Sequence, residues 1–314
     1  MSRLPSLIAV VGPTASGKTD AALEIAKKYA GGSTSSPQAE IILADSRQVY
    51  IGMNIGTNKV PEARNLKHEA CIVQNILYHG VNLVEPNEPF TVQQWKHYAI
   101  ETIGAIVSRG HLPVIEGGTG LYAWALLDNL TLPEVPPDPE LRKELEQQIE
   151  REGLQAVTQE ILEKDPEAAA FLQLDNPRRV IRALEIIRKT GLPFSQQRGQ
   201  GPKLYNDIRI GIDRPLKELD ARISQRAKQQ LDAGLENEVR ALADTIGWEH
   251  PSMSGIGYIE WKEYFAGTIS KTDVFERIVR HTQQYARAQK TWFRRDKNVR
   301  WVSSPQEAVQ IASQ

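Results

Sequence analysis

The stretch Leu7-Ile-Ala-Val-Val-Gly-Pro-Thr-Ala-Ser-Gly-Lys-Thr19 decides the fold of this chain. Residues 7–11 are apolar and rich in β-branched side chains, which is typical of a buried strand in a parallel sheet. The next eight residues match the phosphate-loop pattern G-x-x-x-x-G-K-[ST]. Residues 20–30 continue with helical periodicity and contain neither Pro nor Gly. A strand, a glycine loop and a helix in this order predict a binding site for a polyphosphate or a diphosphate.

Each part of this loop has an expected task. Its glycines let the backbone turn N–H groups toward phosphate oxygens, and the helix N-terminus adds partial positive charge. Lys18 is expected to neutralise a terminal phosphate, and the Thr19 hydroxyl to ligate Mg²⁺. The residues predicted to bind the diphosphate or nucleotide are Gly12, Pro13, Thr14, Ala15, Ser16, Gly17, Lys18 and Thr19.

Composition sets limits on the class of protein. The 314 residues are 40% hydrophobic and 25% charged, as in a globular protein of one large or two modest domains. A single cysteine, Cys71, excludes an internal disulfide and a Cys-based zinc site, and it favours a reducing compartment, so we expect a cytoplasmic protein. The apolar run before the glycine loop is too short to span a membrane. A net charge of −1 means that any case for nucleic acid must rest on local charge.

Short apolar runs predict four further strands, at residues 40–44, 113–116, 208–212 and 299–302, and helical patterns follow at 91–108 and from 121. Residues 52–89 are predicted to form loops and short elements. The alternation of strands and helices predicts an α/β fold with a doubly wound parallel sheet of the P-loop type. Because ligands lie beyond the carboxyl ends of such strands, we expect the glycine loop, Asp45 and the turn 117–120 to share one cleft, with Asp213-Arg214 at a fourth strand end.

Residues 130–204 interrupt this alternation. Four prolines between positions 133 and 139 mark a boundary, and helical patterns without a strand pattern follow. We therefore predict a first part of the core at 1–129, a mainly helical insertion at 130–204, and a second part of the core at 205–314 that includes a basic C-terminal helix.

Two stretches are basic in an otherwise balanced chain. Residues 176–203 carry seven basic residues and one acidic residue, and residues 271–300 carry nine and three. A solvated helix face explains such charge as well as an RNA surface does. Interleaved aromatic residues favour RNA, because single strands are bound by stacking and by basic contacts to phosphate. These aromatic residues are Tyr285, Trp292, Phe293 and Trp301.

Two strand-end residues are candidates for chemistry. Asp45 suits either a carboxylate that holds Mg²⁺ through water or a general base. Thr119, in a turn whose glycines allow close backbone approach, suits either a hydrogen bond to substrate or the N-cap of the next helix.

Six motifs in this order resemble those of the tRNA dimethylallyltransferases, also called tRNA isopentenyltransferases, over residues 7 to about 302. They are Gly12–Thr19, Asp45-Ser-Arg-Gln-Val-Tyr50, Gly117-Gly-Thr-Gly-Leu-Tyr122, Pro177-Arg-Arg-Val-Ile-Arg-Ala-Leu-Glu185, Gly255-Ile-Gly-Tyr258 and Thr291-Trp-Phe-Arg294. The resemblance implies transfer of a dimethylallyl group from dimethylallyl diphosphate to N6 of adenosine 37, in tRNAs that read codons beginning with U. It also implies Mg²⁺ and the release of diphosphate.

The resemblance further implies roles for individual residues. Asp45 would accept the N6 proton, Thr119 would position the adenine or the diphosphate, and Lys18 would stabilise the leaving group together with Arg226. The tRNA anticodon stem-loop would be contacted by Asp45, Ser46, Arg47, Gln48, Thr119, Arg178, Arg179, Arg182, Gly257, Tyr258, Arg287 and Arg294. Because one chain supplies all of these parts, we expect a monomer without membrane attachment.

Three alternatives remain open from the residues themselves. A small-molecule kinase or NTPase would use the same loop for ATP. An isopentenyltransferase that acts on free AMP or ADP would share the loop and the strand order, but it would need neither the insertion nor the basic C-terminal stretch. A non-catalytic RNA-binding module would leave Asp45 and the intact phosphate loop without a purpose.

Overall fold

The computed structural model describes residues 4–29, 39–64, 66–67 and 70–314. Contacts divide the chain into two compact units, residues 1–127 with 204–314 and residues 128–203. The second unit begins two residues before the limit expected from sequence and ends one residue before it. Ala30, the last residue of the predicted first helix, lies outside the described residues.

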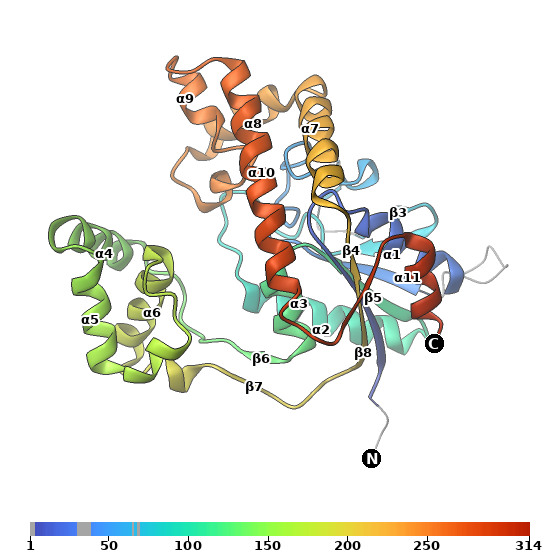
Figure 1. Cartoon of the computed structure of the whole chain (residues 1–314), viewed down its shortest axis with the longest axis horizontal. Coiled ribbons are helices and arrows are strands. Elements are labelled where there is room, and N and C mark those ends of the chain that lie inside the picture. The colour runs from blue at the N-terminus through green and yellow to red at the C-terminus, as the bar shows by residue number, and fades with distance from the viewer. Residues whose placement is uncertain (1–3, 30–38, 65, 68–69) are drawn as a thin grey trace. The chain divides into compact units, whose positions relative to one another are not determined.

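The first unit is built on a seven-stranded sheet with the order β3-β4-β2-β5-β1-β8-β9 (Figure 1). All neighbouring strands are parallel except β3 and β4, which form an antiparallel pair. This confirms the predicted α/β fold with a mostly parallel sheet. The strands are β1 Ser6–Val11, β2 Ala39–Ala44, β3 Cys71–Val73, β4 Ile76–His79, β5 Leu112–Gly117, β8 Asn206–Ile212 and β9 Val299–Val302.

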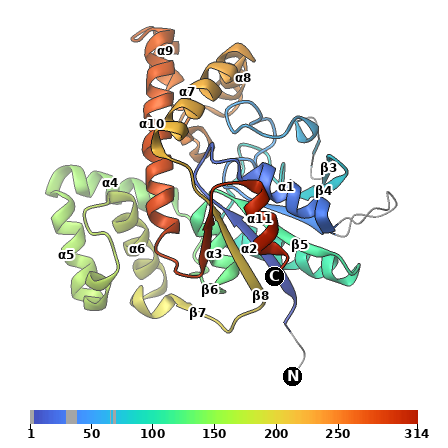
Figure 2. The ribbon, with the colours of Figure 1, turned by 45° about the vertical axis from the view of Figure 1, so that its right-hand side comes forward.

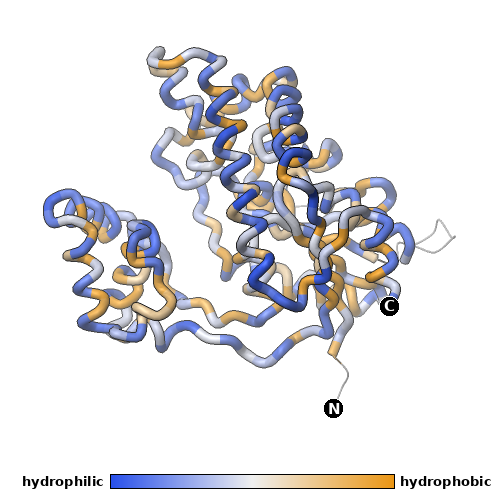
Figure 3. Tube along the Cα trace, in the orientation of Figure 1, coloured by the Kyte–Doolittle hydropathy of each residue, from blue (hydrophilic) through white to orange (hydrophobic). Residues whose placement is uncertain are grey.

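Successive strand residues alternate between two hydrophobic cores, one on each face of the sheet. Leu7, Ala9 and Val11 belong to one core, whereas Ile8 and Val10 belong to the other, as the two-residue period of a strand requires. Helices α1 (Lys18–Tyr29) and α11 (Pro305–Ala312) pack together on the second face. Figure 3 shows hydrophobic residues gathered along the strands.

The first face is covered by helices from the parts of the chain before and after the second unit. Helix α2 (Val92–Ser108) and α3 (Gly120–Leu127) pack on it, and α10 (Lys271–Phe293) contacts α3 and α7 (Leu216–Asp232). Figure 2 shows α7, α8 (Leu235–Ile246), α9 (Trp261–Phe265) and α10 grouped together. Helix α2 matches the helix predicted at 91–108, and it begins with a capping box that was not predicted: the Thr91 hydroxyl accepts from the Gln94 N–H, and the Gln94 side chain accepts from the Thr91 N–H.

The second unit is a small three-helix bundle. Its helices are α4 (Pro139–Glu152), α5 (Leu154–Lys164) and α6 (Pro177–Thr190), and they bury a core that includes Leu145, Val157 and Leu184. The sequence predicted no strand here, but residues Leu130–Thr131 (β6) and Gly199–Gln200 (β7) pair antiparallel where the chain enters and leaves the unit. Two-residue strands carry no detectable periodicity, so the sequence could not reveal them.

Short 3₁₀ turns complete the described secondary structure. They lie at Pro61–Ala63 (η1), Pro166–Ala170 (η2), Ser195–Gln197 (η3) and Pro251–Ser254 (η4).

Candidate active site

The four strands whose ends carry polar residues are neighbours in the sheet. Strands β2, β5, β1 and β8 lie side by side and are parallel. Their carboxyl ends are followed by Asp45, Gly118-Thr119, the glycine loop and Asp213. The topology therefore brings these segments to one edge of the sheet, and their sharing one cleft stays a prediction.

Two arginines of later segments donate hydrogen bonds to backbone carbonyls of the glycine loop. Ala15 and Gly17 have φ angles of 63° and 91°, and such left-handed residues alternate the direction of successive peptide groups. The carbonyl of Ala15 accepts from Arg222 Nε at 2.8 Å, and the carbonyl of Ser16 accepts from Arg214 Nε at 2.5 Å. The Thr14 N–H donates to Gln289 and the Ser16 N–H to the Pro13 carbonyl. Among the described residues, the N–H groups of Ala15 and Gly17 have no hydrogen-bond partner and are available for an anion.

Three buried or half-buried polar groups lie at the loop: the Lys18 ammonium, the Arg226 guanidinium and the Ser16 hydroxyl. Burial lowers the pKa of Lys18, while Glu116 and Asp45 oppose that shift. Burial also lowers the pKa of Arg226 to about 10, with Asp45 opposing, and the Arg226 guanidinium donates to Thr14 Oγ1 at 2.7 Å. The Ser16 hydroxyl is buried, and no residue of the described part of the chain hydrogen-bonds to it. These desolvated groups would gain from an anion in the loop.

A fully buried carboxylate lies behind the loop. Glu116, the next-to-last residue of β5, is 1% exposed. Its Oε1 accepts from Thr19 Oγ1 at 2.9 Å, and its Oε2 accepts from the Tyr78 hydroxyl. Burial raises the pKa of Glu116, whereas Lys18 and the two hydrogen bonds lower it. Sequence analysis assigned no role to Glu116; the signal that could have found it is its position as an acidic residue at the end of an apolar strand.

Asp45 presents one carboxylate oxygen to its own turn. Oδ1 accepts from the N–H groups of Arg47 at 2.8 Å and Gln48 at 3.2 Å. Within residues 4–29, 39–64, 66–67 and 70–314, Oδ2 has no hydrogen-bond or ion-pair partner. One oxygen thus fixes the carboxylate, and the other is free to accept a proton.

Thr119 joins two strand ends. Its Oγ1 accepts from the Ser46 N–H at 3.2 Å, so the side chain does not cap α3. Its backbone carbonyl accepts from the N–H groups of Tyr122 and Ala123 in the first turn of that helix. The hydroxyl therefore lies beside Ser46 and the Asp45 turn, as a shared role at a substrate would require.

The glycines around Thr119 lie so close to other parts of the protein that a side chain would not fit at these positions. A Cβ at Gly117 would overlap the Ala44 carbonyl, and one at Gly120 would overlap the Trp292 ring. A Cβ at Gly118 would lie 2.7 Å from Gln289 Nε2 and 3.4 Å from Lys18 Nζ. These glycines therefore let β2, α10 and the loop lysine approach the turn closely, and a hydrogen bond from Thr119 to substrate stays a prediction.

Helix α10 ties two strand ends together through one side chain. Gln289 is 7% exposed, its Oε1 accepts from the Thr14 N–H at 2.9 Å, and its Nε2 donates to the Gly118 carbonyl at 2.7 Å. The neighbouring Lys290 pairs with Asp213 at 2.6 Å. Sequence reasoning assigned no role to Gln289, and no local pattern could reveal contacts across 275 and 171 positions.

Two residues that were expected to contact tRNA, Arg47 and Tyr258, use their side chains for hydrogen bonds within the protein. The Arg47 guanidinium donates to the carbonyls of Pro251 and Ser252 and to the Ser254 hydroxyl. Tyr258 is 1% exposed and donates to Glu238 at 2.8 Å, so direct RNA contact by its side chain is corrected to a structural role.

The remaining expected RNA contacts of the first unit are mixed. Gly257 is buried, with φ 93°, and its N–H donates to Glu260. Arg287 and Arg294 are exposed and pair with Asp220 and Asp213, each at 2.8 Å. Phe293 is fully buried in the core, so it is unavailable for stacking on a base.

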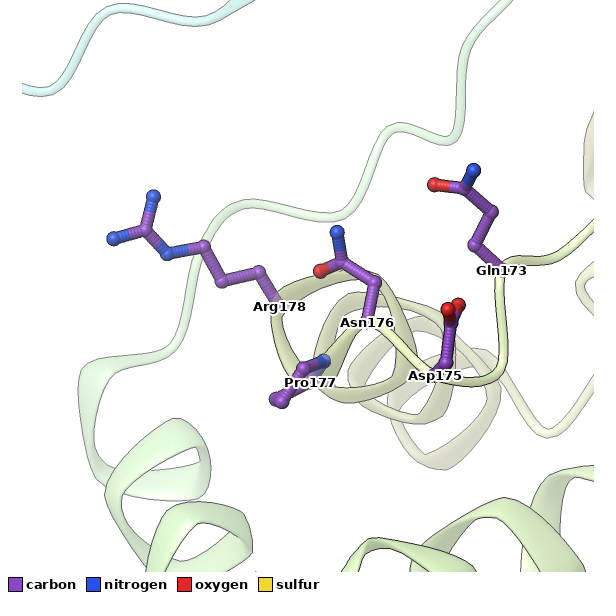
Figure 4. Close-up of a pocket in the computed structure, with 5 residues that line it drawn as sticks. All are labelled: Gln173, Asp175, Asn176, Pro177 and Arg178. Carbon is purple, nitrogen blue, oxygen red and sulfur yellow. The ribbon is translucent and has the colours of Figure 1, made fainter. Parts of the chain in front are cut away.

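The second unit has its own polar surface at the start of α6. Gln173, Asp175, Asn176, Pro177 and Arg178 line a shallow pocket, and the Arg178 side chain extends away from the helix (Figure 4). Arg178 and Arg179 are exposed. Arg182 differs, because its guanidinium pairs with the buried Glu185 and donates to the Val135 carbonyl at 2.7 Å. Arg182 therefore holds the bundle together.

A mostly parallel sheet with a glycine loop on its first strand and carboxylates at the neighbouring strand ends defines a P-loop protein. A family model described as IPP transferase matches residues 48–296. The chain belongs to the IPP transferase family.

Relatives along the whole chain agree. A tRNA dimethylallyltransferase of Roseiflexus sp. (strain RS-1) is 39% identical over 98% of this chain and 95% of its own length. One of Corynebacterium jeikeium (strain K411) is 38% identical over 98% and 97%. The crystal structure of a tRNA isopentenylpyrophosphate transferase from Bacillus halodurans is 34% identical, covers 98% of this chain and 94% of its own, and has a TM-score of 0.68. A eukaryotic dimethylallyltransferase acting on tRNA, 22% identical over 98% and 77%, shares the fold with a TM-score of 0.73.

Proposed function

We propose that this chain transfers a dimethylallyl group from dimethylallyl diphosphate to N6 of adenosine 37 in tRNAs that read codons beginning with U. Membership of the family and the names of its full-length relatives support prenyl transfer to tRNA. The single structural observation that carries the proposal is the free oxygen of Asp45 at the sheet edge that also carries the phosphate loop.

The diphosphate would occupy the loop. The N–H groups of Ala15 and Gly17, the Lys18 ammonium and the Arg226 guanidinium would hold its oxygens. Negative charge builds on the diphosphate as the bond from its oxygen to the allylic carbon breaks, and fixed cations there stabilise the transition state more than the ground state. Lys18 is therefore placed to assist the departure of the leaving group.

The donors at the loop also fit a magnesium ion. The Thr19 hydroxyl and nearby carboxylates are oxygen ligands, which Mg²⁺ prefers, and Mg²⁺ commonly takes few protein ligands together with phosphate oxygens and water. Thr19 would hold the ion directly. When bound, Mg²⁺ supplies additional positive charge against the departing diphosphate.

Asp45 would act as the general base. As the adenosine N6 forms its bond to the allylic carbon, the electron pair of the breaking C–O bond leaves with the diphosphate, and the N6 proton passes to Asp45 Oδ2. The turn bonds from Arg47 and Gln48 hold this carboxylate in place. Thr119 and Ser46, joined by a hydrogen bond, would position the base that has left its stack.

Exposed arginines of both units would hold the anticodon stem-loop. The candidates that remain accessible are Arg178 and Arg179 of α6, Arg287 of α10, and Arg294 directly after α10. Their contacts to RNA phosphates would make tRNA affinity depend on salt.

The same proposal includes a monomer that works in the cytoplasm. One chain carries the loop, Asp45 and the basic helices, and its single cysteine suits a reducing compartment. Among the helices that the structure describes, none is long and apolar enough to cross a membrane.

The test is an incubation with Mg²⁺, dimethylallyl diphosphate labelled in its allyl group, and unmodified tRNA, beside parallel reactions with AMP and with ATP. We expect label in tRNA and none in AMP. Label in AMP without label in tRNA would support the free-nucleotide enzyme, and phosphate release from ATP without any labelled product would support a kinase or NTPase.

A further inference from the structure

Tyr78 and Glu116 form a buried polar pair that the proposed reaction does not use directly. Each side chain is 1% exposed. They come from strands β4 and β5, on either side of β2. The Tyr78 hydroxyl donates to Glu116 Oε2, which leaves Oε1 to accept from Thr19 Oγ1 at 2.9 Å. One continuous chain of hydrogen bonds thus leads from the sheet core to the phosphate loop.

This chain of bonds fixes the direction of the Thr19 hydroxyl. A hydroxyl has one hydrogen and two lone pairs. With its hydrogen given to Glu116, Thr19 Oγ1 turns its lone pairs away from the core, where a cation could take one of them. If nothing accepted the hydrogen, the hydroxyl would rotate and would lose part of its value as a ligand.

The partners of Glu116 connect it with the loop. A buried carboxylate is costly unless it is paired and hydrogen-bonded. Besides Tyr78, its partners are Thr19 through a hydrogen bond and Lys18 through charge, and both belong to the phosphate loop. In packing alone, an apolar residue would fill this position at lower cost.

We propose that Tyr78 and Glu116 are positioning residues that orient the Thr19 hydroxyl toward a magnesium ion bound with the diphosphate. The inference rests on the proposed function, in which Thr19 is the metal ligand. Tyr78 holds the carboxylate in one rotamer, and Glu116 holds the hydrogen of Thr19. Neither touches the substrates.

The test measures binding of inorganic pyrophosphate by calorimetry, with and without Mg²⁺, so that no turnover is needed. The quantity of interest is the ratio of the two affinities. In Glu116→Met, which removes the acceptor, we expect this ratio to fall by about 10-fold or more relative to wild type. Glu116→Gln keeps an acceptor oxygen, so its affinity ratio should lie between that of wild type and that of Glu116→Met. Tyr78→Phe keeps the buried ring and should show a smaller fall in the same direction.

A double variant separates orientation from a general effect of charge. Thr19→Val removes the ligand, so the ratio in Thr19→Val with Glu116→Met should match that in Thr19→Val alone. Additive losses would overturn the inference, because Glu116 would then act independently of Thr19. A wild-type ratio in Glu116→Met would overturn it as well.

The proposed function and the positioning role can be contradicted by different results. Absence of labelled tRNA with the wild-type protein would contradict the transfer reaction, whatever pyrophosphate binding shows. If wild-type protein labels tRNA but Mg²⁺ leaves pyrophosphate affinity unchanged, the transfer reaction stands and the positioning role is overturned. If Glu116→Met does not fold, as judged by circular dichroism, Glu116→Gln and Tyr78→Phe decide the question by the same ratio.

Discussion

At the scale of single residues, the proposal gives the two oxygens of the Asp45 carboxylate different tasks. Oδ1 accepts two turn N–H groups, and we propose that Oδ2 accepts the N6 proton. Asp45→Asn keeps an oxygen for the turn but removes the base. We expect kcat to fall by at least about 100-fold, the low end of general-base contributions, while tRNA affinity stays near that of wild type. The measurement is single-turnover transfer beside tRNA binding.

Asp45→Ala provides the comparison for the turn. This variant loses both the base and the acceptor for Arg47 and Gln48, so we expect it to be at least as slow as Asp45→Asn and to bind tRNA less well. A rate near wild type in Asp45→Asn would remove Asp45 from the chemistry.

Residues that follow strand ends were predictable, because the sheet order brings those ends together. Lys18, Asp45 and Thr119 are of this kind. Arg47 and Tyr258 were expected at the RNA, yet their polar atoms satisfy Ser252 and Glu238, far away in sequence. A motif shows that a residue matters in a family, but it does not show whether the side chain faces solvent or protein.

At the scale of elements, the helices predicted at 20–30 and 91–108 and the five predicted strands followed from periodicity and caps, whereas α7 and α8 were not predicted. The predicted strand 299–302 matches β9, and 208–212 lies within β8. Strands β3 and β4 were missed, because three- and four-residue strands in a segment punctuated by prolines carry too little pattern. Because β4 was missed, Tyr78, which lies within this strand, was missed as well.

The buried carboxylate of Glu40 connects four elements, β2, β4, α2 and β5. Glu40 of β2 contacts His79 of β4 at 2.6 Å, Arg109 after α2 at 2.9 Å and His111 before β5 at 2.8 Å. Burial opposes ionisation of Glu40, but hydrogen bonds from these three residues outweigh it and lower the pKa to about 2. A lowered pKa stabilises the fold fully above the ordinary value of 4.5, and this stabilisation is lost as pH falls toward 2.

We therefore expect Glu40→Gln to lower the free energy of unfolding by about 2–3 kcal/mol at pH 7, with a difference from wild type that shrinks as pH falls from 4.5 toward 2. Urea unfolding across this pH range measures it. Glu101→Gln, at an exposed helix position, is the matched control and should show little difference. A difference for Glu40→Gln that is constant with pH would contradict the account.

At the scale of the whole molecule, the insertion is the part that a free-nucleotide enzyme would not need. Its arginines at the start of α6 divide into exposed Arg178 and Arg179 and paired Arg182. We therefore propose that tRNA binding by this unit depends on the charge that the bundle leaves accessible.

The double variant Arg178→Ala with Arg179→Ala should weaken tRNA binding and reduce the slope of log affinity against log salt by about 1–2. Filter binding at several salt concentrations measures this slope. Arg188→Ala is the control, since Arg188 is paired with Glu160 at 2.6 Å, and its slope should match that of wild type. An unchanged slope in the double variant would place the RNA elsewhere.

The most direct measurement of the central claim is nucleoside analysis after reaction of the wild-type protein with dimethylallyl diphosphate, Mg²⁺ and a tRNA that carries adenosine at position 37. A matched tRNA carries inosine there and so lacks the N6 amine. We predict that the dimethylallyl group appears on adenosine 37 of the first tRNA and nowhere on the second. Equal labelling of the two tRNAs, or labelling at another nucleoside, would contradict the claim that this site alkylates the N6 amine of adenosine 37.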